Sequence, residues 1–358
     1  MEAARLPDSK HLDHLCAPSE NSTGRDDAPH LSAPPAQMIH QLGVGVSVRN
    51  AAEFSVSRRR QQTTVGIFGS SVGAGIRFAI ANIRVPVLIP TRDNTKLYAK
   101  VWGDGRPVVL IHGWPLTADT WDPHALDLAD AGYRVIAYDR RGFGRSEQPW
   151  SGYEYDTLAD DLADVLKATG AEDATLVGFS MGGGEVARYM SRHGGAGVKQ
   201  AVLVSSIVPY MLKTDDNPSG VPQSVFEEIA SGLKEDRPGF YGGFFKDFYG
   251  VGMLNRPVSD ECLEWTRSMA MQGGLKATID CVVAFSSTDF RSELTCFSTP
   301  TLVVHGTEDQ TVPIDCSGRP AAAGIPHATL KEYEGAPHGL LVTHQRQLRD
   351  DLLEFLAG

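Results

Sequence analysis

The sequence predicts an α/β fold, in which a mostly parallel β-sheet is flanked by helices. From residue 85 onward, short runs rich in β-branched residues alternate with segments of helical periodicity, as in sheets built from strand–helix–strand units. Two helical segments, 158–166 and 348–356, carry apolar residues at positions i, i+4, i+7 and i+8, which is the spacing of one buried helix face. The motif GFSMG at residues 178–182 joins a strand to a helix. These observations define a folded domain over residues 85–358.

The individual elements of this domain follow from local sequence. The strands 85–90 and 96–102 are expected to form an opening hairpin around Asp93 and Asn94. The other runs that predict strands are 108–111, 135–139, 174–177, 301–304 and 328–333. A helix is expected to start near Thr157, which together with Asp160 resembles a capping box.

Ser180, at the centre of the GFSMG motif, is the most informative residue of the chain. On a tight strand-to-helix turn, this motif holds the serine in a strained conformation with its hydroxyl at the tip, and the flanking glycines let strand and helix approach closely. The turn also places Ser180 at a helix N-terminus, which favours negative charge. A glycine-rich turn whose serine merely caps a helix would have the same local sequence. The interpretation of Ser180 as a nucleophile therefore depends on the rest of the chain.

A serine nucleophile needs a histidine to accept its proton and a carboxylate to orient that histidine. In this type of sheet, the acid and then the histidine follow the serine along the chain. Asp309 comes just after the strand 301–304, and His338 comes just after the strand 328–333. Because ligands bind outside the carboxyl ends of the strands, we expect Ser180, Asp309 and His338 on one rim, as a catalytic triad.

Other acidic and histidine residues fit these roles less well. Glu308 could orient the base in place of Asp309. His305 lies within a strand and is expected to be a core residue, whereas His112 is expected to hold its loop. Asp139 precedes the serine in the chain, and we expect it to pair with the arginines that follow it.

The oxyanion of an acyl-transfer reaction needs two hydrogen-bond donors. The backbone N–H of Met181, directly after the nucleophile, is expected to be one of them. The loop after the strand 108–111 supplies the other, and there the N–H of Trp114 is the natural donor, because Pro115 has no N–H.

The stretch from about 209 to 285 breaks the strand–helix alternation, and it predicts a mostly helical cap over the site. It contains the aromatic residues Phe240, Tyr241, Phe244, Phe245, Phe248, Tyr249 and Trp265. Together with Trp114 and Phe179, these side chains would make an apolar acyl pocket. Alternatively, most of them pack the cap onto the sheet.

These segments resemble the α/β-hydrolase family of cofactor-free haloperoxidases, also called non-heme chloroperoxidases, perhydrolases and aryl esterases. The resemblance extends from about Val87 to Phe355. It rests on segments in the same order, namely HGWPL at 112–116, DRRGFGRS at 139–146, GFSMGGGEVARY at 178–189, TDFR at 288–291 and APHGL at 336–340. It implies the α/β-hydrolase fold, with an eight-stranded, mostly parallel sheet and a small helical cap.

The resemblance also implies a Ser–His–Asp esterase that makes peracids. Ser180 would be acylated by a small (aryl) ester or a short carboxylic acid, and hydrogen peroxide would replace water as the attacking group. The peracid would then oxidise halide, so that halogenation needs no cofactor, heme or metal. In this family Pro115, next to Trp114, accompanies peroxide competence, and Trp114, Pro115 and Phe179 would line the substrate pocket. Two alternatives stay open: a plain carboxylesterase, and a non-catalytic binding protein that keeps the fold.

The composition narrows the choice of partners. A net charge of −11 argues against nucleic acid and anionic lipid surfaces, and no apolar run is long enough to cross a membrane. The five cysteines are scattered and odd in number, which favours reduced thiols over a disulfide framework. No phosphate-binding glycine pattern, H-E-x-x-H or paired C-x-x-C occurs, so no zinc is expected. The expected partners are small molecules, and whether the chain forms a homo-oligomer stays open.

Residues 1–84 have no counterpart in the family pattern. The first forty residues are polar and are expected to be disordered. Residues 57–81 begin with consecutive arginines and continue as a weakly apolar, glycine-rich stretch, which is similar to a twin-arginine export signal. The long leader before this stretch is unusual for such a signal, and a start at Met38 would fit better. Two interpretations stay open: export through this signal, or an extension without an address on a cytoplasmic protein.

Overall fold

A computed structural model of the chain describes residues 87–358. The predicted disordered extension at 1–84 and the predicted export signal at 57–81 lie outside these residues. Within the described part of the chain, no helix combines the length and the apolar character that crossing a membrane requires.

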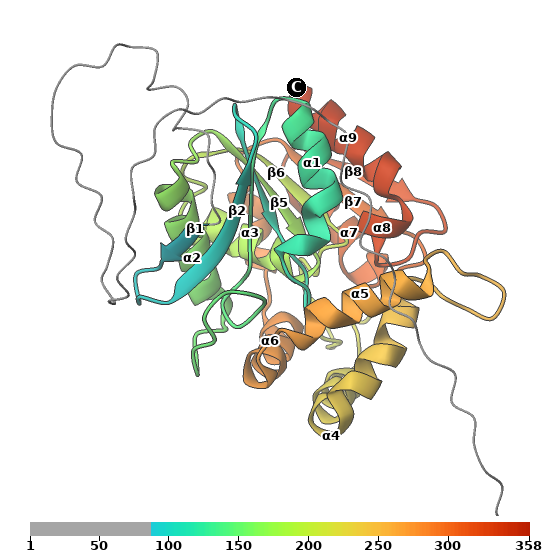
Figure 1. Cartoon of the computed structure of the whole chain (residues 1–358). Coiled ribbons are helices and arrows are strands. Elements are labelled where there is room, and N and C mark those ends of the chain that lie inside the picture. The colour runs from blue at the N-terminus through green and yellow to red at the C-terminus, as the bar shows by residue number, and fades with distance from the viewer. Residues whose placement is uncertain (1–86) are drawn as a thin grey trace, which may run out of the picture. The chain divides into compact units, whose positions relative to one another are not determined.

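Eight strands form one sheet, as predicted (Figure 1). They are β1 (Val87–Pro90), β2 (Lys96–Trp102), β3 (Pro107–Ile111), β4 (Arg134–Tyr138), β5 (Ala174–Phe179), β6 (Val198–Val204), β7 (Thr301–Gly306) and β8 (Ala328–Tyr333). Their order across the sheet is β1-β2-β4-β3-β5-β6-β7-β8. Strands β1 and β2 pair antiparallel, β2 is antiparallel to β4, and the remaining pairs are parallel. The chain therefore has the α/β-hydrolase fold that the sequence predicts.

Helices cover both faces of the sheet. Helices α1 (Asp122–Asp130) and α9 (Gln345–Ala357) contact each other on one face, and α2 (Tyr155–Thr169) and α3 (Met181–Arg192) contact each other on the opposite face (Figure 1). The shorter helices α7 (Gly318–Gly324) and α8 (Leu340–Thr343) lie near the C-terminal strands. The predicted stripes on α2 and α9 are buried, with Leu158, Leu162, Leu348 and Leu352 each fully removed from solvent. Burial of one such side chain stabilises the fold by about 2 kcal/mol.

The start of α2 corrects one prediction. The helix begins at Tyr155, and the residue before it, Glu154, makes no side-chain capping bond. Thr157 instead donates a side-chain hydrogen bond to the carboxylate of Glu154. The predicted capping box of Thr157 and Asp160 is wrong, because both residues already lie inside the helix.

Between β6 and β7 the chain leaves the sheet and forms three helices, within the segment for which a helical cap is predicted. These are α4 (Gln223–Phe248), α5 (Asp260–Met271) and α6 (Leu275–Ser287), which lie together beyond one end of the sheet (Figure 1). Helix α4 is kinked at Asp236, whose φ of −148° and ψ of 80° are not helical. Pro238 follows two residues later and lacks the N–H that a continuous helix would need there.

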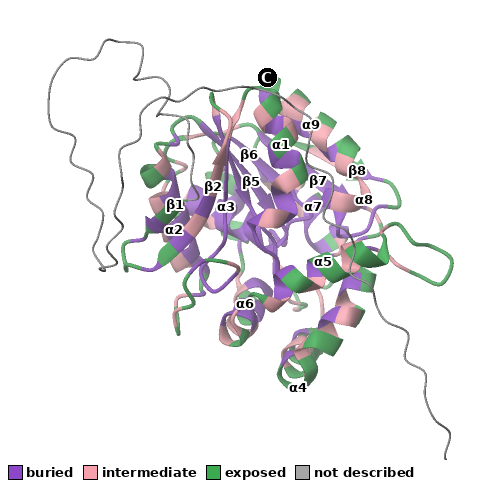
Figure 2. Ribbon diagram, viewed as in Figure 1, coloured by how far each residue is buried: buried purple, intermediate pink, exposed green. Residues whose placement is uncertain are grey.

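The central strands form the core of the molecule. Every residue of β3, β5 and β7 is buried, as expected for parallel strands that helices cover on both faces (Figure 2). The loops at the carboxyl ends of these strands are therefore held by a tightly packed scaffold.

Candidate active site

Ser180 occupies a sharp turn between β5 and α3. Its φ of 54° and ψ of −119° are strained for a residue other than glycine, at a cost of about 1–3 kcal/mol. A Cβ atom on Gly178 would lie 2.5 Å from the carbonyl oxygen of Gly182, and one on Gly182 would lie 2.7 Å from that of Ile111, so both positions require glycine. The side chain of Ser180 makes no capping bond to α3. The alternative interpretation, a serine that merely caps a helix, is therefore wrong.

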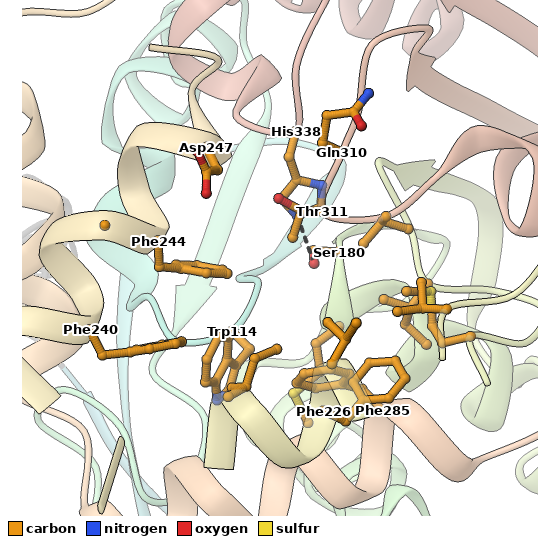
Figure 3. Close-up of a pocket in the computed structure, with 18 of the residues that line it drawn as sticks. Trp114, Ser180, Phe226, Phe240, Phe244, Asp247, Phe285, Gln310, Thr311 and His338 are labelled. Carbon is orange, nitrogen blue, oxygen red and sulfur yellow. Dashed lines mark hydrogen bonds between the residues drawn. The ribbon is translucent and has the colours of Figure 1, made fainter. Parts of the chain in front are cut away.

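The structure brings together the three residues predicted as a triad. The Nε2 atom of His338 lies 3.0 Å from the Oγ atom of Ser180, and its Nδ1 atom lies 2.7 Å from the Oδ2 atom of Asp309. All three residues are buried, although Ser180 keeps 6% of its surface exposed. Figure 3 shows the hydroxyl of Ser180 at the cavity, with His338 directed toward it. Since Asp309 follows β7 and His338 follows β8, the parallel strands deliver both side chains to the same rim.

The carboxylate of Asp309 is held and ionised by its surroundings. Its Oδ1 atom accepts hydrogen bonds from the backbone N–H groups of Thr311, at 3.0 Å, and Val312, at 2.8 Å. Burial alone raises the pKa of Asp309, but the imidazole of His338 and a hydrogen bond from His305 outweigh burial and lower the pKa to about 2. The acid therefore stays negative at neutral pH, and it can stabilise a positive charge on His338.

His305 has a second contact that its place in the sequence did not reveal. It is fully buried, as predicted for a core residue, but its Nε2 atom also lies 3.3 Å from Oδ2 of Asp309. The sequence signal that could have revealed this contact is the position of His305 near the end of β7, four residues before Asp309. Glu308, the alternative acid, is exposed, and the carboxylate that faces His338 is that of Asp309.

The loop after β3 is fastened to α3 through buried charges. The Nε2 atom of His112 accepts a hydrogen bond from the backbone N–H of Arg140 at 2.9 Å, while its Nδ1 atom lies 2.9 Å from the carbonyl oxygen of Gly113. Burial and the charge of Arg140 hold the pKa of His112 well below its usual value. The guanidinium of Arg140 also donates to the carbonyl of His112 at 2.6 Å and pairs with Glu185 of α3. His112 thus holds its loop, as predicted.

Asp139 pairs with only one of the arginines that follow it. Its carboxylate lies 2.7 Å from Nε of Arg145 and accepts a hydrogen bond from the backbone N–H of Ala118 at 2.8 Å. Arg140 and Arg141 pair instead with acids of α3 and α2. Asp139 fixes the loop, as predicted, but it pairs with Arg145 and not with Arg140 or Arg141.

The two predicted oxyanion donors flank the nucleophile. Trp114 and Met181 both line the cavity that contains Ser180, and a Cβ atom on Gly113 would lie 3.0 Å from that of Ser180. The indole Nε1 of Trp114 donates to the carbonyl of Thr278 in α6 at 3.0 Å, which anchors the loop to the cap. Among the loop, turn and cap hydrogen bonds of residues 87–358, none is donated by the backbone N–H of Trp114 or Met181, and Met181, as the first residue of α3, has no acceptor within its own helix. Both amides are therefore available to a ligand.

A mostly apolar cavity of about 480 Å³ lies beside Ser180 and His338 (Figure 3). Its aromatic walls are Trp114 from the loop after β3 and Phe226, Phe240, Phe244 and Phe285 from the cap. Besides the serine and histidine, its polar lining residues are Asp247, Gln310 and Thr311. A cavity of this size and character has room for a small, mostly apolar ligand.

Pro115 and Phe179, predicted to line the substrate pocket, do not line this cavity. Phe179 ends β5, where successive side chains point to opposite faces of the sheet. Its ring packs 5.2 Å from the ring of His338 and 6.1 Å from that of Phe248. Pro115 is buried within the turn that the bond from the Leu116 N–H to the Gly113 carbonyl closes. Of the three predicted residues, Trp114 alone faces the cavity.

The aromatic residues of the cap divide between the two predicted roles. Phe240 and Phe244 line the cavity, whereas Tyr241, Phe245, Phe248 and Tyr249 are buried in packing contacts and Trp265 is exposed. The sequence analysis overlooked Phe226 and Phe285, which line the cavity from α4 and α6. Their positions within amphipathic helices carried no signal that separates a pocket residue from a packing residue.

The described part of the chain holds no group of three or more His, Cys, Asp or Glu side chains arranged to bind a metal ion. Its cysteines are unpaired thiols at positions Cys262, Cys281, Cys296 and Cys316.

Comparison with known proteins identifies the class of this chain. A family model described as the alpha/beta hydrolase fold matches residues 106–345. The chain therefore belongs to the α/β-hydrolase fold family.

Individual relatives extend this result. The chain is 46% identical over 268 residues to a non-heme chloroperoxidase of Kitasatospora aureofaciens, a match that covers 74% of this chain and 98% of that protein. It is 41% identical over 274 residues to a bifunctional esterase/perhydrolase of Acinetobacter calcoaceticus, covering 75% and 99%. The crystal structure of a bromoperoxidase from Bacillus anthracis superposes with a TM-score of 0.74 at 42% identity, covering 76% of this chain and 100% of that chain. The predicted resemblance is confirmed.

Proposed function

We propose that this protein is a serine hydrolase that cleaves small esters through an acyl-enzyme and passes the acyl group to water or to hydrogen peroxide. The observation that carries the proposal is the hydrogen-bonded series from Ser180 through His338 to Asp309, with contacts of 3.0 and 2.7 Å. The names of the relatives, which include chloroperoxidase and esterase/perhydrolase, support the peroxide branch. Pro115 beside Trp114 supports it as well, through the resemblance to peroxide-competent members of the family.

In the acylation step, Oγ of Ser180 attacks the ester carbonyl while His338 accepts the hydroxyl proton at Nε2. The oxyanion that forms accepts hydrogen bonds from the backbone N–H groups of Trp114 and Met181. The carboxylate of Asp309 stabilises the imidazolium. The ester C–O bond then breaks, the alcohol leaves with the proton from His338, and the acyl group stays on Ser180.

In the deacylation step, water or hydrogen peroxide attacks the acyl carbon and gives its proton to His338. Collapse of the second intermediate returns that proton to Ser180 and releases a carboxylic acid or a peracid. A released peracid transfers one oxygen atom to halide in solution, which oxidises the halide to hypohalous acid and reduces the peracid to the carboxylate. Halogenation then requires only the ester or acid, peroxide and halide.

Two other functions compete with this proposal. A plain carboxylesterase would use the same residues with water alone, and a non-catalytic binding protein would use only the cavity. The strained backbone of Ser180 favours catalysis, because strain of this kind persists where the surroundings enforce it and clusters at active sites.

The test is a side-by-side assay of aryl acetate hydrolysis and of bromination in acetate with peroxide. Ser180→Ala is expected to lower both rates by roughly 10³-fold or more and to abolish covalent labelling by a fluorophosphonate. Ser231→Ala, which removes an exposed hydroxyl from α4, serves as the matched control. Full activity in Ser180→Ala would refute the proposal. Hydrolysis without bromination would leave the plain esterase, and a folded protein without either activity would favour the binding protein.

A further inference from the structure

The cavity beside Ser180 contains an acidic side chain that the proposed chemistry does not use. Among the described residues that line the cavity, Asp247 is the one acid, and no lysine or arginine accompanies it. The walls around it are mostly apolar and aromatic. Asp247 itself is exposed, so water partly screens its charge, and its effect on a ligand falls between the values for bulk water and for a protein surface.

Asp247 lies close to the reacting groups. It belongs to the last turn of α4, three residues after Phe244, and both side chains line the cavity from the same helix face. Figure 3 shows its carboxylate pointing into the cavity from above Phe244, on the side of His338. The next residue, Phe248, packs its ring 4.8 Å from the ring of His338, and its carbonyl accepts a hydrogen bond from the N–H of Gly339 at 2.9 Å.

The charge of Asp247 is not neutralised within the described structure. Its carboxylate takes part in none of the side-chain hydrogen bonds or ion pairs found over residues 87–358, whereas acids elsewhere on the cap, such as Asp280, pair with a nearby base. The neighbouring Lys246 is exposed and does not pair with it. The position of Asp247 at the C-terminal end of α4 adds helix-dipole potential of the same negative sign.

We propose that Asp247 is a specificity-determining residue, which makes the site prefer neutral or cationic acyl donors and disfavour anionic ones. The inference rests on the proposed acyl transfer and adds the charge class of its substrate. It implies that, among esters, those with an uncharged or cationic acyl chain are the better acyl donors. Two unit charges about 7 Å apart interact through an effective dielectric constant between that of bulk water and that of a protein surface. This interaction changes kcat/KM of a charged acyl donor, relative to a neutral one, by about threefold to fiftyfold.

The test uses three p-nitrophenyl esters of matched length: hexanoate, the monoester of adipate, and 5-(trimethylammonio)pentanoate. Their acyl ends are neutral, anionic and cationic, and they share one leaving group. Asp247→Asn keeps the shape of the side chain and removes its charge. Relative to hexanoate, kcat/KM of this variant should rise about threefold to fiftyfold for the anionic ester and fall by a similar factor for the cationic ester. Asp247→Lys should reverse the order of preference, and added salt should weaken all these differences.

Glu235→Gln is the matched control, because Glu235 is an exposed acid of the same helix that does not line the cavity. It should leave the three ratios as they are in the wild type. If Asp247→Asn also leaves the ratios as they are, while the wild type still hydrolyses hexanoate, the inference is overturned and the proposed function stands. If the folded wild type hydrolyses none of the three esters, the proposed function fails and the inference fails with it. Ratios to the neutral ester cancel any general loss of activity in the variants.

Discussion

The Nε2 atom of His305 lies 3.3 Å from Oδ2 of Asp309, the same oxygen that lies 2.7 Å from Nδ1 of His338. The Nε2 atom of His305 also lies 2.9 Å from the carbonyl oxygen of Val312. Because a carbonyl oxygen only accepts, this nitrogen carries a proton and donates to both oxygens. His305 therefore holds the acid through the same carboxylate oxygen that the base contacts.

Replacing His305 is expected to loosen the acid without touching the substrate. His305→Phe removes the donor, so the pKa of Asp309 should rise and kcat should fall by about tenfold, with little change in KM. The acid limb of the pH–rate profile should move to higher pH. His305→Gln keeps an N–H donor and should recover part of the loss. Equal loss in both variants, with an unmoved pH profile, would mean that His305 only fills space.

Asp309 itself is expected to govern both activity and stability in acid. Asp309→Asn should lower kcat by up to about 10⁴-fold, because the amide no longer stabilises the imidazolium and favours the wrong tautomer of His338. Initial rates with an aryl acetate, together with a melting curve to confirm folding, would measure this effect.

The stability effect has a definite sign and pH window. The folded-state pKa of Asp309 is about 2, below the unfolded value of about 3.9, so the unfolded chain binds the proton first as the pH falls. The ionised carboxylate thus contributes about 2–3 kcal/mol above pH 4, and this contribution is lost as the pH falls from about 4 toward 2. Melting temperatures of the wild type and Asp309→Asn should converge over that window. A difference that stays constant with pH would contradict this prediction.

The buried pair of Arg140 and Glu185 is expected to tolerate joint replacement better than single replacement. Both side chains are 1% exposed, so Glu185→Gln should leave a buried guanidinium without its counter-charge and destabilise the fold by about 3–5 kcal/mol. The double variant Arg140→Met with Glu185→Leu should recover most of this loss. Denaturant unfolding measures both effects.

An exposed ion pair provides the control for this experiment. Arg319 and Glu332 lie 2.7 Å apart with substantial exposure, so Glu332→Gln should cost less than about 1 kcal/mol. Comparable losses at Glu185 and Glu332 would show that burial of the first pair does not govern its energetics.

Phe285 is expected to limit the length of the acyl chain. Its ring contacts Trp114 with a centroid distance of 5.6 Å and lines the cavity from α6. Phe285→Ala should enlarge the cavity and raise the kcat/KM ratio of octanoate to acetate esters by at least about fivefold, at a cost in stability of about 3 kcal/mol. Val283→Ala, on the exposed side of the same helix, should leave the ratio as it is. An unchanged ratio in Phe285→Ala would place the acyl chain elsewhere in the cavity.

Local sequence was sufficient to predict the residues at strand ends. Ser180, Asp309 and His338 each follow an apolar run, and a parallel sheet brings the carboxyl ends of its strands to one rim. The same reasoning placed Trp114 and Met181 at the nucleophile. It failed where a side chain's direction decides its role, as for Phe179, which packs against His338 and does not line the cavity, and for Phe226 and Phe285, which do.

By itself, the sequence determined the alternation of strands and helices and the five residues proposed for acyl transfer, because these depend on short-range patterns and on strand ends. It determined the α/β-hydrolase fold through the ordered family motifs, but it predicted no strand at β6. Only the tertiary structure decided that Arg140 pairs with Glu185, that His305 touches Asp309 and that Asp247 faces the cavity without a partner. These contacts join elements that are packed together in space. Charge pairing and burial act through distance and local dielectric, which no pattern along the chain specifies.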